Sequence, residues 1–299
     1  MSDGAPQDLP PDAGTPLDTD VLVRIGEVAA ACEAADGAAP FDEATWRALH
    51  DRPAVEVGWW LAEGGVAVEV DGDLGLAVAP DARGAGLGTG LLEEVLAVTE
   101  GEPLRAWSHA DHPAAAALAA SHGFARVREL WVMRRPSSTP LDPATVPDGV
   151  VVASYTDADA DDLLAVNAAA FAAHPEQGAM DAADLASRMA QDWYDPAGLL
   201  LARDAATGEL LGFHWTKRST ADLGEVYVLG IAPAAQGRGL GKVLTLAGLH
   251  HLVDGGPAGH GVREVELYVE ADNTAAVALY AGYGFTHADV DTHVMYARP

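Results

Sequence analysis

The sequence predicts an α/β fold of the α+β type, arranged as two tandem domains with helices flanking each sheet. Three observations predict this fold. The 299 residues suit two domains of about 150 residues each. Predicted strands come in runs and not in strict alternation with helices. The order of predicted elements in the first half recurs in the second, as expected of a tandem duplication.

The first half begins with a tail and continues as helices and strands. Residues 1–17 are rich in Pro, Gly and Asp, which predicts a disordered acidic tail. Apolar residues then recur at helical spacing from Val21 to Cys32, behind a capping Asp18 or Asp20. The remaining predicted elements are a helix over 42–50, strands over 57–62, 66–71 and 74–79, a helix over 86–99, a strand over 104–108, a helix over 112–121 and a strand over 124–134.

A proline-rich segment separates the two halves. The stretch RRPSSTPLDPATVPDG (134–149) carries four prolines and two serines, a composition typical of linkers. We therefore place an N-terminal domain at 18–135, a linker at 136–149 and a C-terminal domain at 150–299. The second half predicts a strand over 150–155, helices over 159–172 and 181–193, strands over 198–203, 209–217 and 224–231, a helix from Gly239, a strand over 264–269, a helix from Asn273 and strands over 284–297.

The composition excludes several classes of function. The formal net charge of −28 disfavours binding to nucleic acid or to an anionic membrane surface. Cys32 is the single cysteine, so we expect neither an internal disulfide nor a cysteine-based metal cluster, and we expect no metal. The sequence lacks a transmembrane-length apolar run and a secretory signal pattern, which predicts a cytoplasmic protein. The acidic surface favours a monomer.

Two pairs of segments support the duplication. LGLAVAPDARGAGLGTG (74–90) aligns with YVLGIAPAAQGRGLGKV (227–243) at an offset of 153 residues. HPAAAALAASHGF (112–124) aligns with NTAAVALYAGYGF (273–285) at an offset of 161. Two matched segments in the same order indicate two copies of one fold.

The glycine-rich segments of both repeats predict a diphosphate-binding loop. Each follows a predicted strand and opens a helix, so glycines with positive φ and the first helical turn can present backbone N–H groups to an anion. The Walker A pattern fails because Gln236 and Val243 stand where Gly and Ser/Thr are required. The dinucleotide pattern G-x-G-x-x-G fails because Leu244 stands at its last position. The alternative to a diphosphate-binding loop is a Gly-rich strand-to-helix turn with a structural role alone.

The loop, with the later Asn273…Tyr280…Gly284-Phe285 segment, resembles the GNAT acyltransferase superfamily. The resemblance implies two GNAT-like domains, each with a mixed, mostly antiparallel central sheet. It also implies that two neighbouring strands splay apart and that one binds the pantetheine arm of acyl-CoA with its backbone. Here the splay is expected between 225–231 and 264–270, with Leu229, Gly230 and Ile231 as the backbone partners.

The two repeats differ in the groups that can move a proton. Glu225 aligns with Gly72, and Tyr280 aligns with Ala119. Acyl transfer from a thioester to an amine benefits from a base for the amine and an acid for the departing thiolate. Glu225, acting through water, and Tyr280 are the candidates, so we predict chemistry in the second half alone. The alternative is that Glu225 caps a strand edge and Tyr280 packs in a core.

Two further segments suggest an acceptor site. HPEQG (174–178) carries His174, Glu176 and Gln177 in a turn, and LGFHWTK (211–217) places His214 and Lys217 beside Trp215, whose face suits a sugar ring. Lys217 and Lys242 are the two lysines of the chain. A solvated surface lysine is the alternative for Lys217.

These segments, with AAPFDEATW (38–46), resemble a tandem-repeat branch of the superfamily that N-acetylates a cysteinyl-glucosaminyl-inositol. The resemblance implies acetyl-CoA as donor, an active C-terminal half and an N-terminal half that holds acetyl-CoA without turnover. It implies that the substrate contacts Glu43, Glu176, Lys217, Glu225 and Tyr268, with the site between the domains. The implied acetyl-CoA contacts in the C-terminal half are Leu229, Gly230, Ile231, Gln236, Gly237, Arg238, Gly239, Leu240, Gly241, Lys242, Asn273, Thr274, Ala275, Ala276, Val277 and Ala278. Those in the N-terminal half are Leu76, Ala77, Val78, Gly84, Ala85, Gly86, Leu87, Gly88 and Thr89.

Two other functions stay open at this point. The same fold can acetylate another amine, such as an aminoglycoside or a protein N-terminus, and acidic residues in the cleft would suit a cationic acceptor. A tandem acyl-CoA sensor with no catalytic activity is the third hypothesis. The presence of Glu225 and Tyr280 in one half argues against the sensor, since sensing needs neither group.

Overall fold

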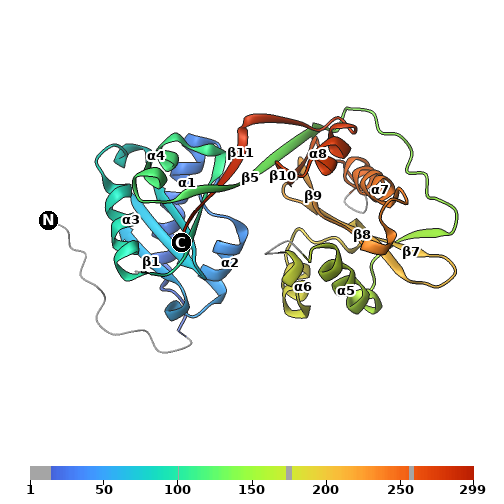
Figure 1. The fold of residues 1–299 in the computed structure, drawn as a ribbon, viewed down its shortest axis with the longest axis horizontal. Helices are drawn as coiled ribbons and strands as arrows, with labels where there is room; N and C mark the ends of the chain where they lie inside the picture. Colours follow the sequence, from blue (N-terminus) through green and yellow to red (C-terminus); the bar gives the residue numbers. More distant parts are fainter. Residues whose placement is uncertain (1–14, 100, 173–176, 256–258) are drawn as a thin grey trace. The chain divides into compact units, whose positions relative to one another are not determined.

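The computed structural model describes residues 15–99, 101–172, 177–255 and 259–299. The chain divides into two compact units: unit 1 comprises Met1–Trp131 and Ala288–Pro299, and unit 2 comprises Val132–His287. The strands β5 (Ala125–Pro136) and β11 (Thr286–Arg298) each run from one unit into the other (Figure 1). The residues from Ala288 onward, which the sequence places in the second domain, therefore group with unit 1.

In unit 1, five strands and the first part of β5 form the sheet, with helices on both faces (Figure 1). Successive residues of a strand point to opposite faces, so Val66 and Val68 pack under the first two helices while Ala67 packs under the next two. The strand order is β1 (Gly58–Ala62), β2 (Gly65–Val70), β3 (Asp73–Val78), β4 (Leu104–Ser108) and β11, and the helices are α1 (Thr19–Asp36), α2 (Glu43–Asp51), α3 (Leu87–Val98) and α4 (Pro113–Ser121).

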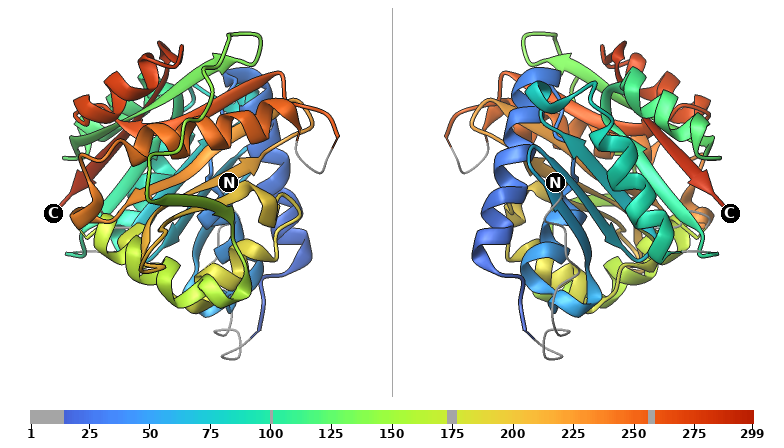
Figure 2. Two further views of the ribbon diagram at one scale, coloured as in Figure 1. Left: turned by 90° about the vertical axis from the view of Figure 1, so that its right-hand side faces the viewer. Right: turned by 90° about the vertical axis from the view of Figure 1, so that its left-hand side faces the viewer.

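Unit 2 repeats this plan, and its sheet comprises the last residues of β5 and five further strands. Helices α5 (Ala160–Ala170) and α6 (Ala182–Met189) cover one face of its sheet, and α7 (Leu240–Asp254) and α8 (Thr274–Ala281) cover the other (Figure 2, left). The strand order is β5, β10 (Glu264–Glu270), β9 (Leu223–Ile231), β8 (Leu210–Arg218), β7 (Leu199–Asp204) and β6 (Val150–Ser154).

The sheets confirm the predicted fold class. Neighbouring strands from β1 to β3 and from β6 to β9 are antiparallel, whereas β4 runs parallel to β3 and β10 runs parallel to β9. Each sheet is therefore mixed and mostly antiparallel. Within the described residues, no helix combines the length and apolar character that crossing a membrane requires.

Two predicted elements differ from the structure. The chain closes with a single strand, β11, because Thr286–Arg298 contains neither Gly nor Pro to turn it. Helix α6 ends at Met189 and not at 193. Trp193 and Tyr194, which follow it, leave the helix and pack against Trp215.

Candidate active site

Glu225 lies near the start of β9, where β9 is paired on both sides. Its Cα partners are Lys217 on β8 and Glu266 on β10. Oε2 of Glu225 lies 3.9 Å from Nζ of Lys217 and accepts a hydrogen bond from Ser219 Oγ at 3.4 Å. Arg134 pairs with Glu266 at 2.7 Å and offsets the charge of this second carboxylate. Glu225 is 8% exposed, so it combines burial with hydrogen-bonding and ionic partners, a setting that suits a proton acceptor.

Lys217 is held on an aromatic wall. Its Nζ lies 5.1 Å from the ring centroid of Trp193 and 5.2 Å from that of Tyr227, within the range of a cation–π contact. The two rings stack edge to face at 4.9 Å. The ammonium of Lys217 is therefore oriented by two aromatic faces and lies next to Glu225. These contacts argue against the alternative that Lys217 is a solvated surface lysine.

The prediction that Trp215 offers its face to a sugar is wrong. Trp215 is fully buried, with 0% exposure, and contacts Trp193, Tyr194 and Tyr227. His214 points to the opposite face of β8, also with 0% exposure, and its Nδ1 donates to the carbonyl of Leu244 at 2.7 Å. Strand alternation explains both positions, because β8 is a central strand with helices on each face.

Tyr280 lies on α8 and is 8% exposed. Its ring packs edge to face against Phe285 with the centroids 5.8 Å apart. Burial raises the pKa of the phenol to about 12, so it stays protonated at neutral pH and can donate a proton. Tyr280 therefore packs in a core and also keeps its phenolic proton at neutral pH.

The predicted splay of two strands is confirmed. The parallel pairing of β9 with β10 runs from Leu223–Glu264 to Val226–Leu267, and the strands then continue separately to Ile231 and Glu270. On its other edge, β9 pairs with β8 through an irregularity between Trp215 and Thr216, where the partner changes from Val228 to Val226. Bulges of this kind bend a strand and re-aim its side chains.

The glycine loop after β9 has the backbone expected of an anion cradle. Gly237 and Gly239 have φ values of 77° and 79°, and Gly239 caps the N-terminus of α7. A cavity of about 680 Å³ lies against this helix start and α8. Among the predicted acetyl-CoA contacts, it is lined by Gly239, Lys242 and Ala278, together with linker residues including Asp142 and Pro147.

The other residues predicted to contact the substrate or acetyl-CoA lie on several different elements of the fold. Glu43 is the first residue of α2 in unit 1, and Tyr268 on β10 is 43% exposed. The side chain of Asn273 caps α8 by accepting from the N–H of Ala276 at 3.2 Å. Leu240 is 2% exposed in the core cluster beneath α7. Both His174 and Glu176 lie outside the described residues.

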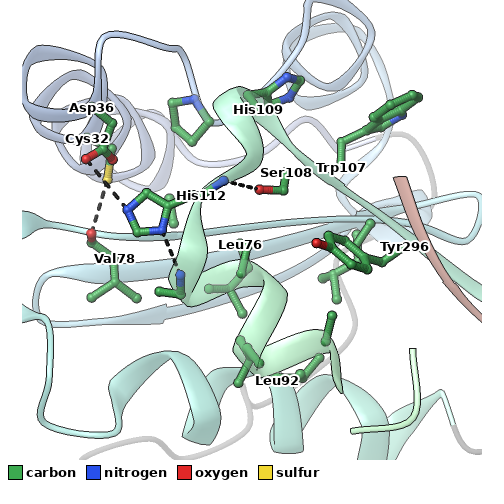
Figure 3. A pocket seen from close by; sticks show the side chains of 18 of the residues that line it. Cys32, Asp36, Leu76, Val78, Leu92, Trp107, Ser108, His109, His112 and Tyr296 are labelled. Atoms are coloured by element: carbon green, nitrogen blue, oxygen red, sulfur yellow. Dashed lines mark hydrogen bonds and ion pairs between the residues drawn. The ribbon is translucent and has the colours of Figure 1, made fainter. Parts of the chain in front are cut away.

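Unit 1 carries the same backbone plan around a cavity of about 270 Å³ (Figure 3). Its β3–β4 pairing runs from Asp73–Arg105 to Leu74–Ala106, after which the strands separate. Gly84 and Gly86 have φ values of 79° and 85°, close to those of the second loop. The predicted N-terminal contacts Leu76, Ala77, Val78 and Gly84 line the cavity, together with Ala119, the residue aligned with Tyr280.

Comparisons with known proteins agree with this geometry. A model of the acetyltransferase (GNAT) family matches residues 40–124 and 165–285. A mycothiol acetyltransferase from Nocardioides sp. is 59% identical over 295 residues, covering 93% of this chain and 98% of that protein. Another from Nocardia farcinica is 49% identical, with 92% and 94% covered. The chain belongs to the mycothiol acetyltransferases of the GNAT family.

Solved structures share the fold of this chain, and one of them is described as a tandem GNAT protein. A tandem GNAT protein from the clavulanic acid biosynthesis pathway has a TM-score of 0.69, with 19% identity over 95% of this chain and 97% of that one. A GCN5-related N-acetyltransferase from Sphaerobacter thermophilus has a TM-score of 0.64, with 24% identity and coverage of 92% and 91%. The chain is an acetyl-CoA-dependent N-acetyltransferase with two GNAT domains.

Sequence reasoning missed several neighbours of Glu225. Glu266 and Arg134 belong to the same polar cluster, and the aromatic wall of Trp193 and Tyr227 orients Lys217. The alternation in EVELYVE (264–270) places Glu266 on the face shared with Tyr268, so that signal was available. The role of Arg134 depends on strand order, which the sequence alone does not give.

Proposed function

We propose that unit 2 transfers acetyl from acetyl-CoA to the cysteinyl amine of 1D-myo-inositol 2-(L-cysteinylamino)-2-deoxy-α-D-glucopyranoside. The products are mycothiol and CoA. The observation that carries this proposal is the buried Glu225–Lys217–Ser219 cluster on the strand that splays from β10 and leads into the glycine loop. The printed names of the relatives support the substrate class.

The reaction is a direct attack of the amine on the thioester. The nitrogen forms a bond to the acetyl carbon while the carbon–sulfur bond breaks. Glu225 accepts the amine proton through water, and the phenol of Tyr280 donates a proton to the departing thiolate. The acceptor is an α-amine with an ordinary pKa of about 7.7–8.0. A sizeable fraction is therefore neutral near pH 7 and able to attack.

Donor and acceptor are bound by different parts of the chain. The backbone of Leu229, Gly230 and Ile231 holds the pantetheine arm, and the amides of the loop from Gln236 to Lys242 hold the diphosphate. Carboxylates and Lys217 bind the hydroxyl groups of the pseudodisaccharide through charge-assisted hydrogen bonds. This acceptor set is Glu43, Glu176, Lys217, Glu225 and Tyr268.

The first repeat binds acetyl-CoA without turning it over. It has the strand splay and the positive-φ glycines, but Gly72 and Ala119 stand where Glu225 and Tyr280 stand in the second repeat. We further propose that the protein acts as a monomer in the cytoplasm.

An acceptor panel tests the function. The protein is incubated with acetyl-CoA and, separately, with cysteinyl-glucosaminyl-inositol, an aminoglycoside and a peptide amine. Acetylation is read by mass spectrometry of the acceptor, because the preferred substrate carries its own thiol and would disturb thiol-based assays. Acetylation of the cysteinyl compound above the others is expected. Preferential modification of the aminoglycoside or peptide would overturn the substrate assignment, and no modified acceptor with CoA still bound would favour a sensor.

A further inference from the structure

In unit 1, the arginine that opens the glycine loop is folded back into the protein. Nη1 and Nη2 of Arg83 donate to the two carboxylate oxygens of Asp36 at 2.8 and 2.6 Å. Its Nε donates to the carbonyl of Val78 at 2.9 Å. Asp36 is the last residue of α1, and both side chains line the 270 Å³ cavity (Figure 3 labels Asp36). All five N–H groups of an arginine can donate, and here three are engaged internally.

The Val78 carbonyl, on the splaying strand, is also occupied. It accepts from Arg83 Nε and from the thiol of Cys32, whose sulfur lies 3.3 Å away. A backbone carbonyl has two lone pairs, so both are in use. Val78 is one of the residues predicted to contact the N-terminal acetyl-CoA. A pantetheine amide that bonds to this carbonyl must therefore displace one of the internal donors.

The second repeat has a different arrangement at the matching positions. Arg83 aligns with Gln236 and Val78 aligns with Ile231. Glutamine carries no charge and cannot form a bidentate ion pair with a carboxylate. The ion pair between Asp36 and Arg83 therefore distinguishes the acyl-CoA loop of the first repeat from that of the second.

The electrostatics of the pair oppose binding of an anion. The hydrogen bonds from Arg83 lower the pKa of Asp36 below its ordinary value, so the carboxylate is ionised at neutral pH. Arg83 provides the cation best placed to meet a diphosphate, because it opens the loop. Asp36 neutralises that cation, so the pair presents no net positive charge to a diphosphate.

We propose that Asp36 is an affinity-determining latch of the first repeat: it holds Arg83 away from the diphosphate of an acyl-CoA, in a position where Arg83 also occupies the Val78 carbonyl that would meet the pantetheine. The inference rests on the proposed role of both repeats as acetyl-CoA cradles. Binding of an acyl-CoA in unit 1 must break the Asp36–Arg83 ion pair. The site in unit 1 therefore binds acyl-CoA more weakly than the site in unit 2.

Calorimetric titration of the full chain with CoA tests the latch. The wild type is expected to bind one tight equivalent in unit 2 and a weaker equivalent in unit 1. Asp36→Asn removes the charge and releases Arg83, so the weaker dissociation constant is expected to fall about tenfold, the scale of a charge-assisted hydrogen bond. The tight equivalent and the turnover number should stay unchanged.

Two further variants keep the test specific. Arg83→Gln installs the residue of the second repeat and frees the Val78 carbonyl from one donor, but it also removes the cation, so it should strengthen the weaker site less than Asp36→Asn does. Asp73→Asn removes a comparable bidentate pair with Arg105, at 2.7 and 2.9 Å, and should behave as the wild type. Circular dichroism and thermal unfolding establish that each variant is folded.

The outcomes separate the latch from the proposed function. Two equally tight equivalents in the wild type, or an unchanged weaker site in Asp36→Asn, would overturn the latch. Equal strengthening in Asp36→Asn and Arg83→Gln would do so as well, because the gain would not depend on Arg83. Loss of the tight equivalent from every protein would instead contradict the proposed cradle in unit 2.

Discussion

Glu225 draws its chemical environment from three different strands. Lys217 comes from β8, Glu266 from β10, and Arg134 reaches Glu266 from β5. The sequence identified Glu225 because a glycine stands at the aligned position of the first repeat. It could not identify the partners, since they depend on which strands lie side by side and in which register. A residue type is visible in a sequence, whereas its neighbours across a sheet are not.

Tyr280 provides a test of the proton donor. Tyr280→Phe keeps the ring contact with Phe285 but removes the phenolic proton, so kcat is expected to fall about 10²-fold with little change in affinity for acetyl-CoA. Because the phenol has a pKa of about 12, this group should not limit wild-type turnover by ionising between pH 7 and 10. Steady-state kinetics with the cysteinyl acceptor measures both values.

Tyr155→Phe is the matched control, because Tyr155 is 7% exposed in the core of the same unit. It should retain wild-type turnover. If Tyr280→Phe also retained full turnover, the phenol would be a packing group and the proton would reach the thiolate from elsewhere.

At the scale of single elements, strand β8 shows where sequence patterns were misleading. The string HWTK predicts an aromatic face for a sugar, yet Trp215 and His214 are both fully buried on opposite faces of the strand. Lys217 alone among these three reaches the candidate site. A strand with helices on both faces buries polar and aromatic residues alike. The alternation of residues in the sequence does not reveal that helices cover both faces.

The buried His214 predicts a dependence of stability on pH. Burial lowers its pKa from 6.5 to about 4, so the unfolded state binds the proton more readily than the folded state. The stabilisation is complete above about pH 6.5 and is lost as the pH falls towards 4, by about 3 kcal/mol in total. Urea unfolding of the wild type at intervals between pH 4 and 7 measures this loss.

His214→Gln isolates the contribution of this histidine. Glutamine can donate to the Leu244 carbonyl but does not titrate, so the variant should lose less stability than the wild type over the same pH range. Other titrating groups are common to both proteins and cancel in the difference. Equal acid slopes for the two proteins would contradict the assignment to His214.

At the scale of the whole molecule, the tandem repeat accounts for both what the sequence predicted and what it did not. The aligned segments predicted the order of elements and the positive-φ glycines, and the resemblance to the GNAT superfamily implied the splay between β9 and β10. The last strand was not placed in this way. Residues from Ala288 onward belong to the second repeat in sequence, yet they complete the sheet of unit 1, where β11 pairs with β4. Repeat boundaries follow the sequence, whereas compact units follow strand pairing.

This exchange of the last strand predicts where a mutation in β11 acts. Val294 is 0% exposed in the core of unit 1, so Val294→Ala is expected to lower the free energy of unfolding by about 2 kcal/mol. Hydrogen exchange should speed up in Leu104–Ser108, its partner strand. Val127→Ala, at a residue 52% exposed, should change little. Faster exchange confined to Glu264–Glu270 would contradict the placement of β11.

The central claim is that a duplicated chain performs chemistry in its second half alone, with Glu225 as the base. The most direct test is the turnover of Glu225→Gln with acetyl-CoA and the cysteinyl acceptor, measured beside its affinity for acetyl-CoA. If Glu225 is the base, kcat is expected to fall about 10²–10⁴-fold with nearly unchanged affinity for acetyl-CoA. Retention of half the wild-type turnover would contradict Glu225 as the base, and equal losses of turnover and affinity would show that Glu225 is structural.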